Sequence, residues 1–306
     1  MAALLHLFTY VAVIVAAVAI VAKAYKWASM PIHLRWELYP VPQEAEKAEH
    51  GGSFYEELDW WKKDRNASLV NEIMAMAIEA LFIKALYENN RKLWYRSFPF
   101  HFGLYLLIGS VGLAVLASLM ALVGFYPVLF GGILINLIKL TGFLGLVLST
   151  IGAAALLHRR LTDEELIDYT APRDIFNLVA FLVAFACAWI SFAFSNEGTL
   201  SLNRYIYSIV SFKLSTPIGG FFVGLTLLLF SCLIMYVPLS HMSHFVGKYF
   251  MWHKVRWDDV PNLRGSDIEK KILTCVSYPV SWSARHLNAD GKKNWLDIAT
   301  EDLPQK

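Results

Sequence analysis

Residues 99–123 read PFHFGLYLLIGSVGLAVLASLMALV, an uninterrupted apolar run with a single histidine, His101, near its start. About 20 helical residues cross the roughly 30 Å hydrocarbon core of a bilayer, so this run is long enough to span a membrane. Four comparable runs cover residues 3–22, 133–157, 175–194 and 217–243. Because a segment in lipid must satisfy its own backbone hydrogen bonds, we expect all five runs to be helices.

The composition agrees with an integral membrane protein. Of the 306 residues, 57% are hydrophobic and only 17% are charged, and a soluble protein of this length would need more polar surface. The net charge of +2, without a basic tract rich in aromatic residues, argues against a nucleic-acid partner. The first run has no basic residue before it, whereas Lys23 and Lys26 follow it. A retained span therefore fits better than a cleaved signal peptide.

The distribution of basic residues predicts the orientation. Lysine and arginine are frequent in 23–96, in 158–174 and after 244, whereas 124–132 has none. By the positive-inside rule, the N-terminus lies outside and the C-terminus in the cytoplasm. The expected domains are a first transmembrane helix (1–22), a cytoplasmic insert (23–98), a four-helix membrane domain (99–245) and a cytoplasmic tail (246–306).

The two cytoplasmic parts contain features that suggest contacts with other surfaces. After Ser68, apolar residues recur with helical spacing, which predicts an amphipathic helix. This helix lies along the membrane surface, against a partner, or packed under the bundle. The tail contains a helical stretch near 266–276 and tryptophans at 257, 282 and 295. Aromatic residues in a segment too small for its own core predict docking on a partner.

Histidines stand at the predicted cytoplasmic ends of three runs: His101, His158, and the pair His241 and His244. Histidine at the edge of a bilayer needs a partner that lipid cannot supply, and a haem iron held between imidazoles of two helices is such a partner. His241 and His244 lie on neighbouring ridges, so one can bind iron while the other bonds a propionate or a carbonyl. The alternative is a pair of histidines exposed to water.

Residues near these histidines fit the same interpretation. His101, Tyr105, Ile108 and Gly112 share one helical face, where the small glycine leaves room for a flat macrocycle. A glycine face that packs another helix is the alternative. Arg159 and Arg160 at the same level could pair with haem propionates, although they also serve as positive-inside anchors.

One cation falls on the opposite side of the membrane. Lys139 precedes His158 by 19 residues, which is about 28 Å along a helix and places it near the outer interface. Its side chain can extend to the interfacial water. Alternatively, Lys139 and Asn136 could bind the carbonyl group of a quinone.

The chain resembles the gamma subunit of respiratory nitrate reductase, a cytochrome b with five spans and an outside N-terminus. Three segments support the resemblance: Leu157-His158-Arg159-Arg160-Leu161 at the end of the third span, Val237-Pro238-Leu239-Ser240 followed by His244, and His101 in the second span. By this pattern, His101 and His244 hold a haem near the cytoplasm, with His241 and His158 as reserve ligands. The ligand positions of that family's second haem are Val111 and Thr226 here, so one b haem is expected, without excluding a second.

Other segments resemble a narrower group, the membrane cytochromes of sulfate-reducer redox complexes. They are Pro31 to Pro40, Asn90 to Pro99, Trp282-Ser283-Ala284, Trp295 and Ala299-Thr300-Glu301. The group includes the sulfite-reduction-associated complex and the transmembrane tetrahaem-cytochrome complex. The resemblance implies a prokaryotic inner-membrane subunit that transfers electrons between menaquinone and a cytoplasmic iron–sulfur protein similar to heterodisulfide reductase. It also implies a periplasmic multihaem cytochrome c as a contact of the outer face.

Two other functions are compatible with five apolar spans. A haem-free membrane anchor would tether a redox partner and would not need histidines at matching depth. A small-molecule transporter would need polar or broken helices at mid-membrane, whereas these runs are apolar at their centres.

Overall fold

The structure is a computed structural model that describes residues 2–29, 57–59, 62–64, 68–125, 128–194, 199–247, 249, 263–281, 283–284 and 289–301. The segment 31–40 and the tryptophans Trp257 and Trp282, which the sequence singled out, lie outside these residues. The chain divides into two compact units. The first contains Met1–Ala19 and Ala77–Met242, and the second contains Ile20–Met76 and Ser243–Lys306.

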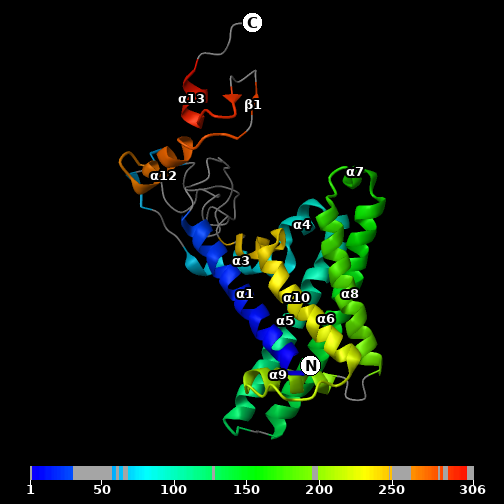
Figure 1. Cartoon of the computed structure of the whole chain (residues 1–306). Helices are drawn as coiled ribbons and strands as arrows, with labels where there is room; N and C mark the ends of the chain where they lie inside the picture. Colours follow the sequence, from blue (N-terminus) through cyan, green and yellow to red (C-terminus); the bar gives the residue numbers. More distant parts are fainter. Residues whose placement is uncertain are drawn as a thin grey trace. The chain divides into compact units, whose positions relative to one another are not determined.

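The described residues contain five long helices at the five predicted runs, which confirms that these runs are helical: α1 (Ala2–Ser29), α5 (Arg91–Leu122), α6 (Val128–Thr162), α8 (Pro172–Phe194) and α10 (Phe221–Leu239). Each is long and apolar enough to cross a membrane. The chain is therefore a mostly helical protein with the architecture of a multi-pass membrane protein (Figure 1).

The helix ends differ from the boundaries of the apolar runs. Helix α5 begins at Arg91 and continues through Pro99, because polar turns extend a helix beyond the hydrocarbon and proline is tolerated in membrane helices. Helix α10 is shorter than its run. It begins after Gly220, whose φ of 122° favours glycine, and ends at Leu239 before Ser240, which is extended. A 3₁₀ turn, η3 (His241–Ser243), follows.

Shorter elements connect and extend the long helices. They are α3 (Leu69–Phe82), α4 (Lys84–Asn89), α7 (Glu164–Ile167), α9 (Thr199–Val210), α12 (Asp267–Val276), β1 (Ser283–Ala284), β2 (Ala289–Asp290) and α13 (Trp295–Thr300). The predicted helices after Ser68 and near 266–276 are confirmed as α3 and α12. Strands β1 and β2 form an antiparallel pair, and α7 joins α6 to α8 (Figure 1).

Helices α5 and α6 pack against each other with unusually close backbones. A Cβ atom added to Gly145 of α6 would lie 2.9 Å from the Gly103 carbonyl oxygen of α5. Further along the pair, the Ser110 hydroxyl of α5 donates to the Ile138 carbonyl of α6 at 2.9 Å. Small residues at such a contact allow two membrane helices to approach closely. The pair therefore forms a fixed support for the side chains at its ends.

Apolar side chains of α5, α6 and α8 form the main core of the first unit. Phe100, Leu146, Phe181 and Phe185 are buried together, and Phe185 is fully buried. A second cluster combines Leu5 of α1 with residues of α9 and α10. These clusters fix the rotation of the helices, and therefore the direction in which their polar residues point.

Candidate functional site

His101 lies on α5, half-buried, one turn after Ser97. Its Nδ1 donates to the Ser97 carbonyl oxygen at 2.8 Å and lies 3.3 Å from the Ser97 hydroxyl. Because a carbonyl only accepts, this bond places the ring proton on Nδ1 and the lone pair on Nε2. Metal-binding histidines commonly have this arrangement, since the second-shell bond fixes the tautomer and the ring orientation.

The face of α5 that carries His101 is open farther along the helix. Ile108 is 70% exposed, and a Cβ added at Gly109 or Gly112 would meet nothing within 4 Å. Gly112 therefore does not pack against a neighbouring helix within the described residues. Gly103 of the same helix, by contrast, packs closely against the backbone of α6.

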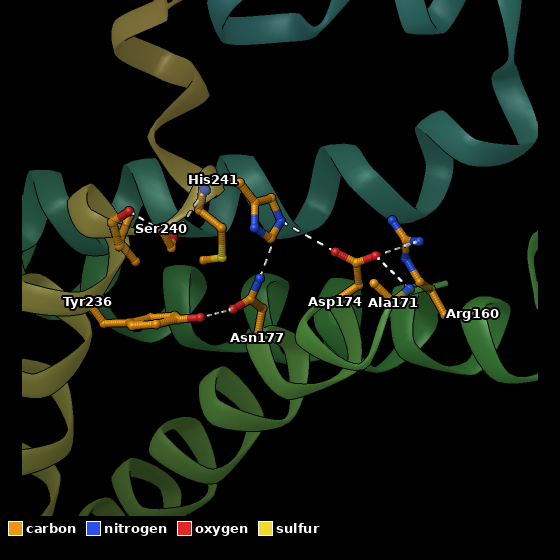
Figure 2. A network of polar contacts seen from close by, with 9 residues as sticks. Arg160, Ala171, Asp174, Asn177, Tyr236, Ser240 and His241 are labelled. Atoms are coloured by element: carbon orange, nitrogen blue, oxygen red, sulfur yellow. Dashed lines mark hydrogen bonds and ion pairs between the residues drawn. The ribbon is translucent and has the colours of Figure 1, made fainter. Parts of the chain in front are cut away.

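His241 belongs to a network of polar contacts that joins α6, α8 and α10 (Figure 2). Its Nε2 lies 3.4 Å from the Asp174 carboxylate and 3.4 Å from the Asn177 amide nitrogen. The Tyr236 hydroxyl donates to the Asn177 carbonyl oxygen at 2.7 Å, which turns the amide nitrogen towards the imidazole. Nε2 thus faces one acceptor and one donor, so either protonation state of His241 finds a partner.

Arg160 joins the same network from the end of α6. Its guanidinium lies 3.4 Å from Asp174, whose carboxylate also accepts from the Ala171 amide at 3.2 Å. Arg159 instead pairs with Asp163 at 3.0 Å, one turn farther along its own chain segment. Each of the two predicted propionate partners therefore already contacts a carboxylate of the chain.

The remaining predicted residues are spread over both units. His244 lies in the second unit, exposed, in a helical turn over 244–247, whereas His101 and His241 belong to the first. His158 is exposed near the end of α6. Lys139 and Asn136 are both exposed on α6, three residues apart and thus neighbours on its surface.

The sequence analysis did not identify Asp174 and Asn177, which contact His241 Nε2. It also did not identify Tyr236, which binds Asn177. A signal existed: Asp174 and Asn177 are polar residues three apart at the start of an otherwise apolar helix, so they share a face. Asn177 is only 4% exposed, and a buried amide requires hydrogen-bond partners. The identity of those partners depends on the rotation of α8 against α10, which the sequence pattern does not contain.

A second polar cluster surrounds His6 of α1. His6 is fully buried, with Nδ1 2.8 Å from the Ala2 carbonyl oxygen and Nε2 2.7 Å from the Ser208 hydroxyl of α9. Next to it, Thr9 contacts the Tyr205 hydroxyl at 2.7 Å and the Ser231 hydroxyl of α10 at 2.9 Å. These bonds hold α1 against α9 and α10.

Comparisons of the chain with protein-family models, curated proteins and solved structures find no match. The family resemblance rests on the sequence segments quoted above.

Proposed function

We propose that the chain is a membrane cytochrome b subunit of a quinone-linked oxidoreductase complex. One b haem, bound by His101 and His244, would relay electrons between menaquinone and a cytoplasmic iron–sulfur protein. In this proposal the N-terminus lies outside a prokaryotic inner membrane, and the insert and the tail form the docking surface for the partner. A periplasmic multihaem cytochrome c would contact the opposite face.

The observation that carries the proposal is the hydrogen bond from His101 Nδ1 to the Ser97 carbonyl oxygen. It presents the tautomer that binds iron through Nε2. The open surface around Gly112 on the same face also suits a flat macrocycle. Both features fit a haem group beside α5, and a haem supplies a reversible one-electron carrier whose potential depends on its axial ligands and burial.

We take His244 as the second ligand, as the family resemblance implies, with His241 as the reserve. His241 Nε2 lies between Asp174 and Asn177 at the end of α10, and it would have to leave both to bind iron through this nitrogen. Arg160, held by Asp174 at the same end, adds a positive charge that favours a nearby propionate.

The surroundings of His6 support a single haem. Both of its ring nitrogens have partners within the first unit, the Ala2 carbonyl and the Ser208 hydroxyl. Binding of a second haem iron through Nε2 of His6 would require this nitrogen to give up the Ser208 hydroxyl in a fully buried site. We therefore expect a haem-to-protein ratio of one.

The test is a reduced-minus-oxidised absorbance spectrum of the purified chain and three alanine variants. We expect a b-type band in the wild type and in His241→Ala, and its loss in His101→Ala and His244→Ala. His241→Ala is the matched control, because it removes an imidazole three residues from His244. A wild type without the band would identify a haem-free anchor, and full haem retention in His101→Ala or His244→Ala would refute the ligand assignment.

A further inference from the structure

The C-terminal turns of α3 expose an apolar surface whose position is fixed by α5. From Ala77 to Phe82, the large apolar side chains Ile78, Leu81 and Phe82 are 40%, 47% and 51% exposed. The only charged residue of this stretch is Glu79, and its carboxylate accepts from the Ala85 amide of α4 at 2.8 Å. The charge is therefore directed to the start of the next helix rather than to the apolar surface.

Two side chains of α5 satisfy carbonyl groups at the end of α3. The Tyr105 hydroxyl donates to the Ala80 carbonyl oxygen at 2.8 Å, and the Trp94 indole donates to the Phe82 carbonyl oxygen at 2.7 Å. The last four carbonyls of a helix have no partner within the helix, and in water the solvent can supply one. In lipid, the protein itself must supply it. The end of α3 is thus equipped for a medium that is poor in water.

Aromatic rings add to this attachment. Phe82 stacks on Phe98 of α5 with ring centroids 6.4 Å apart, and Phe98 stacks in turn on Trp94 at 4.5 Å. Helices α3 and α4 meet at Ile83, whose φ is 52°. A branched residue in this left-handed region is strained and persists only where its surroundings hold it. Because of these contacts, the depth of the C-terminal end of α3 in the membrane follows from the depth of α5.

The position of Tyr105 along α5 sets this membrane depth. Arg96 is the last charged residue of α5, which ends at Leu122. A membrane span requires about 20 residues, and every such stretch between Arg96 and Leu122 includes Tyr105. Helical side chains lean towards the N-terminus of their helix, so the Tyr105 hydroxyl and the Ala80 carbonyl lie slightly towards Arg96. These groups therefore lie in the part of the apolar core next to the interface, where tyrosine and tryptophan are enriched.

We propose that the segment Ala77–Phe82 of α3 inserts into the membrane boundary, with Ile78, Leu81 and Phe82 among the lipid acyl chains. The occupant of this surface is the bilayer, because the segment is bonded to the apolar span α5 through Tyr105 and its one carboxylate is bound to the Ala85 amide instead of lying on the surface. The inference does not depend on a haem. It makes α3 an additional membrane contact of the chain that does not cross the bilayer.

Spin labels on the full chain test this proposal. Cys187, Cys232 and Cys275 are replaced by alanine, and single cysteines are introduced at Ile78 or Leu81. Ile151, 58% exposed in the apolar part of α6, gives the lipid-facing control. Lys92, exposed near the start of α5, gives the aqueous control. The protein is reconstituted in vesicles of phosphatidylethanolamine and phosphatidylglycerol, and relaxation of each label by oxygen and by a water-soluble nickel complex is measured.

We expect the oxygen-to-nickel ratio at Ile78 and Leu81 to shift towards the Ile151 value and away from the Lys92 value. A ratio equal to that of Lys92 would place the surface in water and overturn the proposal. Exclusion of both reagents would overturn it as well, because a second copy or another protein surface would then cover the segment.

A pair of tyrosine variants tests the role of the capping bonds. Tyr105→Phe removes the hydroxyl that binds the Ala80 carbonyl, so we expect the nickel complex to gain access to a label at Leu81. Tyr95→Phe removes a hydroxyl from an exposed ring on the same helix and should leave that access unchanged. Equal access in both variants would show that the Tyr105 bond does not hold the segment at the membrane boundary.

Discussion

Asp174 is the residue that connects the polar network at the end of α8. Its side chain is 18% exposed and contacts Arg160 of α6 and His241 after α10, as well as the Ala171 amide before its own helix. Near the start of a helix, a carboxylate is also favoured by the helix dipole. One acidic side chain thus stabilises a helix terminus and joins two neighbouring helices to it.

Replacing Asp174 by alanine should therefore destabilise the first unit more than replacing Asp163. Asp174→Ala leaves Arg160 and His241 without their shared carboxylate, and we expect a loss of about 1–3 kcal/mol. Asp163→Ala removes the pair with Arg159 four residues away, and an ion pair of this kind contributes about 0.5 kcal/mol. Thermal unfolding of the protein in detergent measures both. Equal effects would mean that Asp174 acts only as a local cap.

At the scale of the helix, the close contact of α5 and α6 depends on glycine at particular positions. Gly103 and Gly145 face each other, and the Cβ of an alanine at Gly145 would also lie 2.9 Å from the Leu107 amide nitrogen. Backbone atoms cannot move away without separating the helices. Gly109, on the same helix as Gly103, has nothing within 4 Å of an added Cβ, so a methyl group there meets no protein atom.

Gly145→Ala should consequently destabilise the protein by about 1–3 kcal/mol, because it overpacks a rigid contact. Gly109→Ala is the matched control, and it should be neutral or stabilising by up to about 1 kcal/mol, since alanine favours the helix. Resistance of the folded protein to unfolding in sodium dodecyl sulfate compares the two. The packing account would be wrong if both variants unfolded at the same detergent concentration.

The five long helices could be predicted from the sequence because lipid imposes a minimum length and excludes charge from the centre of a span. The ends of the helices could not be predicted in this way. Helix α5 continues through Pro99 to Arg91, and the apolar pattern does not extend into those polar turns. Nor could the bonds from Trp94 and Tyr105 to the end of α3 be predicted, because they join residues 12 and 25 positions apart through an unusual turn at Ile83.

At the scale of the whole molecule, α6 separates two groups of candidate residues. The helix is continuous from Val128 to Thr162, so Lys139 and His158 are held about 28 Å apart on one axis. The sequence spacing predicted this separation because both residues lie on one element. The sequence also placed His241 and Arg160 at a common level, and they do share Asp174. It did not reveal Asp174, because that contact requires the fold to bring three helices together.

This separation allows the quinone site that the sequence suggested at Lys139 and Asn136 to be tested independently of the proposed haem. Lys139 is exposed in an otherwise apolar stretch of α6, with Asn136 beside it, and an ammonium group can donate to a quinone carbonyl. With a soluble one-electron acceptor in excess, two equivalents of which are reduced per quinol, Lys139→Met should slow the oxidation of a naphthoquinol about tenfold, which corresponds to a lost interaction of about 1.4 kcal/mol. The b-type absorbance band should remain, because the substitution lies far from His101 and His244 in the proposed topology.

The matched control is Lys213→Met, which removes another lysine, located after α9 and over the Tyr207 ring. This variant should oxidise the quinol at the wild-type rate. If Lys139→Met also kept the wild-type rate, the lysine would serve only to reach interfacial water, and quinol would bind elsewhere. If Lys139→Met lost the absorbance band together with its activity, the two ends of α6 would not be independent, and the haem would depend on residues near Lys139.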